Sequence, residues 1–234
     1  MAAVAACLWA AGPAQATTDV TMHPSFLPDR LGASTAFTLA FRFSGSEEGV
    51  PAPLSAMVVR LPAGLRIDLR GVATCAPSRL RRGPASCPSR SLLGRGHALL
   101  EVHAGSQTIA EESTIRVFRG PNRGSRPTFE IFGHGETPLD QSAISTAILL
   151  PDGAPYGSKL TVSVPPIPTL VYEPNASISS LSVTIGNVGS NPRAHAAGMI
   201  VLPRSCPAGG FPFAASFTFE DHSTASAAAQ VPCP

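Results

Sequence analysis

Hydrophobic and polar residues alternate along much of this 234-residue chain. From position 37 to position 43 every second residue is Phe or Leu, and the residues between them are Thr, Ala and Arg. Such alternation places one face of a strand in a core and the other in solvent, which is typical of antiparallel sheets. Apolar runs separated by Pro and Gly turns predict further strands at residues 56–61, 65–69, 97–102, 108–110, 114–118, 128–132, 144–150, 160–164, 181–185, 199–202, 213–219 and 224–231.

These strands predict an all-β fold. No stretch shows the 3.6-residue periodicity of a helix over three turns, although one helical turn fits at residues 78–81. A dozen short strands without long helices indicate an antiparallel β-sandwich, immunoglobulin-like or jelly-roll-like. Only 14% of the residues are charged, against roughly 25% in ordinary globular domains, and eleven Phe are available for a core. We expect a single domain over residues 17–234, with two smaller sandwiches divided near residues 151–166 as the alternative.

The N-terminus has the features of an export signal. Residues 2–11 are apolar, and Ala14-Gln15-Ala16 has the small-x-small form that signal peptidase cleaves, so residues 1–16 are predicted to be removed. Cys7 follows Val4-Ala5-Ala6 and loosely matches a lipobox, which makes a lipoprotein the alternative. No later window holds 18 uninterrupted apolar residues, so we expect no membrane span. The protein is therefore expected outside the cell or in the cell envelope.

Four cysteines remain after the signal: Cys75, Cys87, Cys206 and Cys233. An even number in an exported chain predicts two disulfides, and four cysteines permit three pairings. Pairing of sequence neighbours would close loops of about 13 and 28 residues, and loop entropy would then contribute roughly 3 to 4 kcal/mol for each bridge. The spacing disfavours a zinc site, because there is no C-x₂-C pair and no His at ligand spacing from a Cys.

Two groups of residues resemble a pattern found in exported actinobacterial proteins. The first group is Leu61-Pro62-Ala63-Gly64-Leu65, Cys75, Cys87-Pro88, Ser91 and Leu93-Gly94, similar to LPxGL followed by Cys and CPxxSxxG. The second group is Cys206-Pro207-Ala208-Gly209-Gly210, Phe217-Thr218-Phe219 and Pro232-Cys233. The resemblance implies a shared disulfide-bonded scaffold. Those proteins have no assigned activity, so it carries over no functional residue.

The sequence favours a non-enzymatic protein that uses no cofactor and no metal. It contains neither G-x-S-x-G nor S-x-x-K, the motifs of common serine hydrolases. Glu130 has no second carboxylate on its own strand, and the adjacent Glu111 and Glu112 would point to opposite faces. We therefore expect these carboxylates to be solvated. An extracellular hydrolase whose carboxylates are assembled by the fold, and an adhesion-like or toxin-like secreted subunit, are the alternatives.

The distribution of charge gives one candidate binding site. Residues 69–100 contain six Arg and no Asp or Glu, whereas the chain as a whole has a net charge of only +2. Guanidinium groups bind phosphates and carboxylates, so this segment predicts contact with an anionic envelope polymer or a lipid headgroup. Nucleic acid is disfavoured because no aromatic residues lie among the arginines. The candidate residues are Arg79, Arg81, Arg82, Arg90 and Arg95.

Overall fold

The computed structural model describes residues 18–45, 50–104, 107–186 and 199–234. The expected export signal, residues 1–16, lies outside the described residues, and so does Cys7 of the lipoprotein alternative. Within the described ranges, none of the helices has the length and apolarity that crossing a membrane requires.

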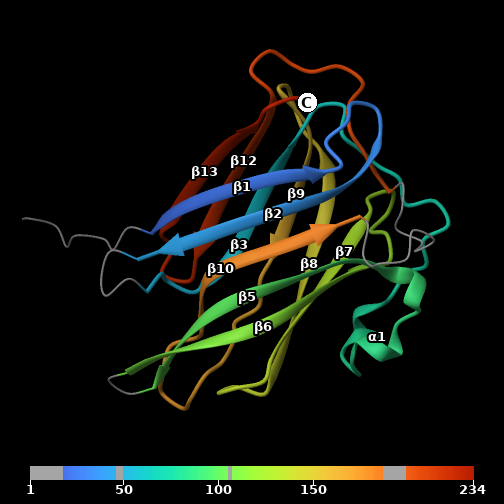
Figure 1. Cartoon of the computed structure of the whole chain (residues 1–234). Coiled ribbons are helices and arrows are strands. Elements are labelled where there is room, and N and C mark those ends of the chain that lie inside the picture. The colour runs from blue at the N-terminus through green and yellow to red at the C-terminus, as the bar shows by residue number, and fades with distance from the viewer. Residues whose placement is uncertain (1–17, 46–49, 105–106, 187–198) are drawn as a thin grey trace, which may run out of the picture.

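The regular secondary structure of the described residues is almost entirely antiparallel strand, which confirms the predicted fold class (Figure 1). The strands are β1 (Asp19–Leu27), β2 (Ser34–Ser44), β3 (Leu54–Pro62), β4 (Arg66–Ile67), β5 (Leu92–Ala104), β6 (Gln107–Arg119), β7 (Thr128–Gly135), β8 (Gln141–Pro151), β9 (Tyr156–Ser163), β10 (Ser177–Ile185), β11 (Ile200–Val201), β12 (Phe211–Phe219) and β13 (Thr224–Val231). The helical segments are short: α1 (Pro77–Leu80) and the 3₁₀ turns Pro84–Ser86 and Ser89–Ser91.

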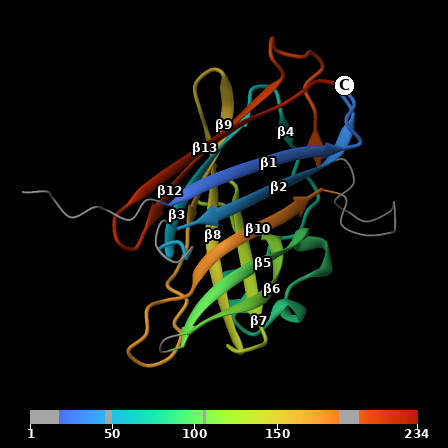
Figure 2. The ribbon, with the colours of Figure 1, turned by 60° about the vertical axis from the view of Figure 1, so that its left-hand side comes forward.

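The strands form two facing layers that belong to one continuous sheet. The hydrogen-bonded order is β13-β12-β3-β9-β8-β7-β6-β5-β10-β2, and β2 also pairs with β1, β11 and, through β11, β4. The sheet curls so that its edge strands β1 and β13 lie side by side (Figures 1 and 2). The segment around residues 151–166 lies inside this sheet, because β9 pairs with β8 on one side and with β3 on the other.

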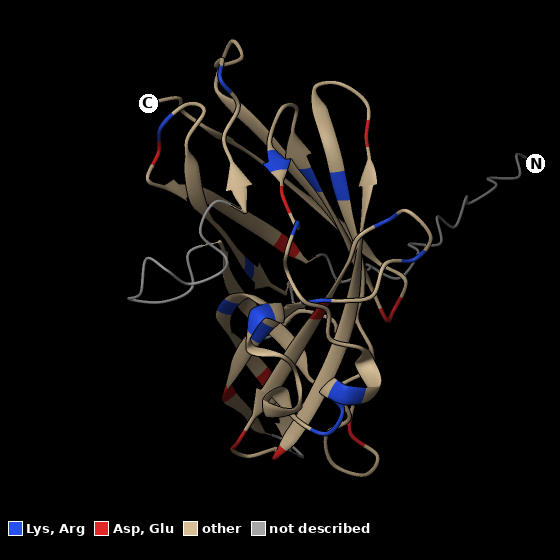
Figure 3. Ribbon diagram, turned by 90° about the vertical axis from the view of Figure 1, so that its right-hand side faces the viewer, with Lys and Arg blue, Asp and Glu red and all other residues tan. Residues whose placement is uncertain are grey.

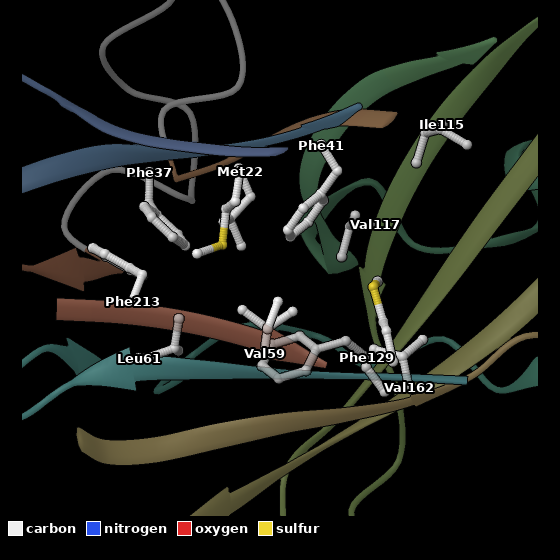
Figure 4. Packing of buried hydrophobic residues seen from close by; sticks show 14 of the residues in the cluster. Met22, Phe37, Phe41, Val59, Leu61, Ile115, Val117, Phe129, Val162 and Phe213 are labelled. Carbon is white, nitrogen blue, oxygen red and sulfur yellow. The ribbon is translucent and has the colours of Figure 1, made fainter. Parts of the chain in front are cut away.

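Phenylalanine fills much of the space between the layers. All eleven Phe of the chain are buried, and nine of them belong to this core. Phe37 of β2 stacks on Phe213 of β12, with ring centroids 5.4 Å apart, and Phe41 meets Phe217 edge to face. Figure 4 shows residues of both layers pointing into this shared core. The alternation of residues 37–43 predicted a strand with one face in the core, and this is confirmed, because the apolar residues form the inner face of β2.

Two segments are more continuous than the sequence predicted. Residues 108–110 and 114–118 belong to one strand, β6, whose central residues pair with β5 without interruption. Gly94 and Gly96 lie inside β5, whereas the sequence predicted a strand that begins at residue 97. A Cβ at Gly96 would come within 2.1 Å of the Ser182 carbonyl oxygen, so glycine permits the close approach of β5 to β10 there.

Both disulfides join sequence neighbours, Cys75 to Cys87 and Cys206 to Cys233. The loop that contains the first bridge lies on the outer face of the sheet, where Leu80 of α1 packs with Phe118 and Phe132. The backbone N–H of Cys75 donates to the Arg119 carbonyl oxygen at 2.8 Å. The single helical turn expected near residues 78–81 is present as α1.

Candidate functional site

The interior of the curled sheet is not completely filled. A cavity of about 450 Å³ lies between the layers, which is within the usual size range of small-molecule sites. It follows the inner face of β6 from Glu111 to Val117, a span of roughly 20 Å at about 3.4 Å per residue. Its lining is mostly apolar and comes from both layers, including Phe41, Val59, Leu100, Ile115, Phe129, Val162, Leu181 and Val183.

Burial along β10 shows that this space is empty of protein. Ser182 faces outward and Leu181 and Val183 face the cavity, yet all three are only half-buried. In a fully packed core the two inward residues would be completely enclosed. Ile131 of β7 and Leu160 of β9 are half-buried on the same cavity wall. The inner face of the sheet therefore presents aliphatic surface to a space that no side chain occupies.

The cavity reaches the surface beside β8. The ladder between β8 and β9 begins at Thr146, so residues 141–145 are paired on their β7 side alone. The chain leaves β9 through Val164, Pro165 and Pro166, and proline cannot donate a backbone hydrogen bond that would continue the ladder. Residues 164–168 line the cavity from one side and residues 141–145 from the other. We call this opening the mouth.

One carboxyl group lies at the mouth end of the cavity. Glu111 on β6 is 1% exposed and lines the cavity, and neither of its carboxyl oxygens has a hydrogen-bond partner among the described residues. Its carboxyl leans over Gly135 of β7, where a Cβ would come within 2.0 Å of Oε1. Leu139, from the turn between β7 and β8, packs with Leu100 and closes this end of the sheet. Glu111 is thus enclosed by apolar groups.

The surroundings of Glu111 disfavour its ionised form. Burial raises the pKa of Glu111 above its ordinary value of 4.5. The Leu139 backbone amide lowers this pKa to a smaller extent, without hydrogen-bond geometry to either oxygen, and so does the charge of His134. His134 itself lies on the outer face, with Nε2 at 4.0 Å from Asp140. Since burial is the largest influence, the neutral acid is favoured compared with a solvated Glu.

The expectation of solvated carboxylates is wrong for two residues. Glu130 on β7 is 2% exposed under the loop that follows β6, and it accepts a hydrogen bond from Thr146 Oγ1 at 2.7 Å. Burial raises the pKa of Glu130 as well. Glu111 faces the cavity, whereas Glu130 is on the outer face beside Phe118, seven residues further along β6. The fold therefore does not bring the two buried carboxyls together, and Glu112 is exposed as its outward position requires.

The predicted arginines lie on the outer face, on or next to the loop that the Cys75–Cys87 bridge closes. Arg79 is in α1, Arg81 and Arg82 directly follow it, and all three are exposed with no carboxylate partner among the described residues. Arg81 also lines the cavity. Figure 3 shows basic residues on the side of the molecule that carries α1.

The other two predicted arginines are placed differently. Arg90 donates to the Gly71 carbonyl oxygen at 3.2 Å. Arg95 of β5 is exposed on the outer face, directly opposite Arg116 of β6. Like charges at directly opposed positions of neighbouring strands repel each other. The arginines therefore form one group around α1 and a separate pair on β5 and β6.

Comparisons with family models, curated proteins and solved structures found no match to this chain. Within the described ranges, His, Cys, Asp and Glu do not gather in groups of three or more that would hold a metal ion.

One feature of the sequence marks the cavity, although it predicts something else. Residues 111–113 interrupt the apolar pattern of β6, so they indicated a break between two strands. The strand is continuous, and the polar inward residues of this stretch, Glu111 and Ser113, face the cavity instead. A polar residue at an inward position of a continuous strand is thus the sequence feature that marks the site.

Proposed function

We propose that this chain is an exported, non-enzymatic binding protein that holds an elongated apolar molecule in its interior cavity. The observation that carries the proposal is the apolar cavity with its mouth beside β8. Export is supported by the signal-like residues 1–16 and by the two disulfides, which persist in oxidising compartments.

The size of the cavity favours occupation by a ligand. Protein interiors are close-packed, and apolar side chains beside an unfilled space lose the contacts that they would make in a packed core. The apolar side chains around this space of about 450 Å³ lack those contacts in the free protein. An apolar ligand that fills the space restores the missing contacts.

A pair of substitutions on β10 tests the proposal. The only Trp of the chain is Trp9, so a protein comprising residues 17–234 contains no Trp. Leu181→Trp places a large side chain in the cavity, and Ser182→Trp places the same side chain on the outer face of the same strand. We expect the wild type and Ser182→Trp to bind the neutral dye Nile red, and Leu181→Trp to bind it at least tenfold more weakly. Dye fluorescence measures the affinities.

Thermal unfolding of each Trp variant shows whether it is folded. Absence of Nile red binding to the folded wild type would contradict the proposal. Equal binding by both Trp variants would contradict it too, because the dye would then bind outside the cavity.

A second function is favoured by the arginine group around α1. We propose that Arg79, Arg81 and Arg82 hold the protein at an anionic envelope polymer or lipid headgroup. The support is that the three side chains are exposed, lack acidic partners among the described residues, and lie on a loop closed by a disulfide. Arg81 is also at the cavity surface, so contact with an anionic surface would bring the mouth close to it.

Replacement of Arg79, Arg81 and Arg82 by Ser tests this contact. We expect the wild type to sediment with vesicles containing phosphatidylglycerol and to be released by high salt, because salt screens exposed charges. The triple variant should remain in the supernatant. Replacement of Arg30, Arg42 and Arg204, which are exposed elsewhere, is the matched control for lost charge. Retention of the triple variant on the vesicles at the wild-type level would remove this function.

A further inference from the structure

We infer that the ligand of the cavity carries a hydroxyl group, and that Glu111 forms a hydrogen bond with it. This inference rests on the proposed function and adds the chemistry of the ligand's polar end. It is carried by a single feature: a carboxyl that is 1% exposed, faces an apolar cavity and has no hydrogen-bond partner among the described residues.

A buried polar group without a partner is unfavourable, and native proteins rarely retain one without a function. Glu111 stands at a position where Leu would suit the neighbouring apolar residues, Leu100 and Leu139. Ser113, two residues along the same face of β6, is 5% exposed and also lines the cavity. The polar part of the inner wall of β6 is therefore confined to the mouth end, and the remainder, Ile115 and Val117, is apolar. The ligand that matches this wall has one polar end and an apolar chain.

A hydroxyl group matches Glu111 in either protonation state. It accepts a hydrogen bond from the neutral acid and donates one to the carboxylate. The ammonium group of a protonated amine only donates, so it suits only the ionised form of Glu111, which burial disfavours. A carboxylate ligand suits only the neutral form, and it would be repelled whenever Glu111 ionises. An ether accepts but cannot donate. The alcohol is therefore the class that the site accommodates best.

Four ligands of one chain length test this chemistry: decan-1-ol, methyl decyl ether, decanoic acid and decylamine. Each is titrated against the wild-type protein loaded with Nile red, and displacement of the dye gives the affinity. The same titrations are made with Glu111→Leu, Glu111→Gln and Glu112→Leu. Glu112 is the adjacent carboxylate on the outer face of β6, so its variant is the matched control.

We expect decan-1-ol to bind the wild type about tenfold more tightly than the ether, because the alcohol can make one more hydrogen bond than the ether with either form of Glu111: it donates to the carboxylate, and it both accepts from and donates to the neutral acid. This preference should disappear in Glu111→Leu, persist in part in Glu111→Gln, because the amide also donates and accepts, and remain complete in Glu112→Leu. The inference is overturned if the acid or the amine binds the wild type more tightly than the alcohol. It is also overturned if Glu111→Leu keeps the preference for the alcohol.

Two outcomes keep this inference separate from the proposed function. If no ligand displaces the dye and the dye itself does not bind, the cavity is not a binding site and both fail. If alcohol and ether displace the dye equally well from the wild type, the cavity binds apolar chains and the role of Glu111 alone fails. Should Glu111→Leu not fold, the ranking on the wild type together with Glu111→Gln decides the question.

Discussion

Glu111 lowers the stability of the free protein, and a hydrogen bond to the proposed ligand would offset this cost. Its carboxyl is enclosed by apolar groups without a hydrogen-bond partner among the described residues, and burial raises its pKa. An acid whose pKa is higher in the folded state than in the unfolded state stabilises the fold at low pH. That contribution is lost as the pH rises through the folded pKa. Glu111 therefore lowers the stability of the unliganded protein at neutral and alkaline pH.

Glu111→Leu should raise the free energy of unfolding at pH 8 by about 1–3 kcal/mol, the penalty of an unsatisfied buried polar group. The gain should be smaller at pH 4, where the carboxyl of the wild type is protonated. His134 and Asp140, which lie near this end, and Glu130 are present in both proteins. Urea unfolding at both pH values measures the difference, with Glu112→Leu as the control. A gain at pH 4 equal to or above that at pH 8 would contradict this explanation.

The position and the burial of Glu111 could be predicted from the sequence only in part. Adjacent residues of a strand point to opposite faces, and Glu111 and Glu112 do so in β6, although the sequence predicted a break between two strands at this point. It did not show which face would be enclosed, because enclosure depends on Leu139 and on layers contributed by distant residues. Glu130 was missed for the same reason, since the segment that covers it closes over it through tertiary packing.

The loop closed by Cys75 and Cys87 packs on the outer face of the sheet and contributes no strand to it. Leu80 is its fully buried anchor, packed on Phe118 and Phe132. Arg119 Nη1 donates to the carbonyl oxygens of Leu69 and Val72, which fixes the chain leading into the loop. The sequence identified the loop and its one helical turn from its Pro, Gly and Cys residues. Its docking on the outer face depended on two Phe whose outward direction no local pattern revealed.

Removal of the Cys75–Cys87 bridge should therefore reduce stability without abolishing ligand binding. The double variant Cys75→Ser/Cys87→Ser should lose about 3 kcal/mol of unfolding free energy by loop entropy, and Cys206→Ser/Cys233→Ser, which opens a longer loop, about 3.5 kcal/mol. Urea unfolding measures both losses. Nile red binding to the folded Cys75→Ser/Cys87→Ser variant should stay close to that of the wild type, because strands form most of the cavity wall. Loss of dye binding by that variant in its folded state would contradict this separation.

The local alternation of polar and apolar residues predicted where strands lie along the chain, but it did not predict the order of the strands in the sheet. The antiparallel class and both disulfides followed from the sequence and are confirmed. The neighbours of β3 are β12 and β9, pairings between residues more than 90 positions apart. Such partners are chosen by the complementary shapes of the two faces, which a single sequence read locally does not contain. The cavity follows from this order and from Pro165 and Pro166, which follow β9 and cannot donate hydrogen bonds to β8.

The antiparallel order also fixes at which end of the molecule β1 begins and β13 ends. Between β13 and β1 the sheet has an odd number of strands, so these two edge strands run in the same direction. Asp19 consequently lies at the end of the molecule that holds Glu111 and the mouth, whereas β13 delivers Pro234 to the opposite end (Figure 1). A sensor chip coupled through the C-terminus would hold the protein with its mouth toward the solution. Coupling just before Asp19 would turn the mouth toward the chip and obstruct whatever enters there.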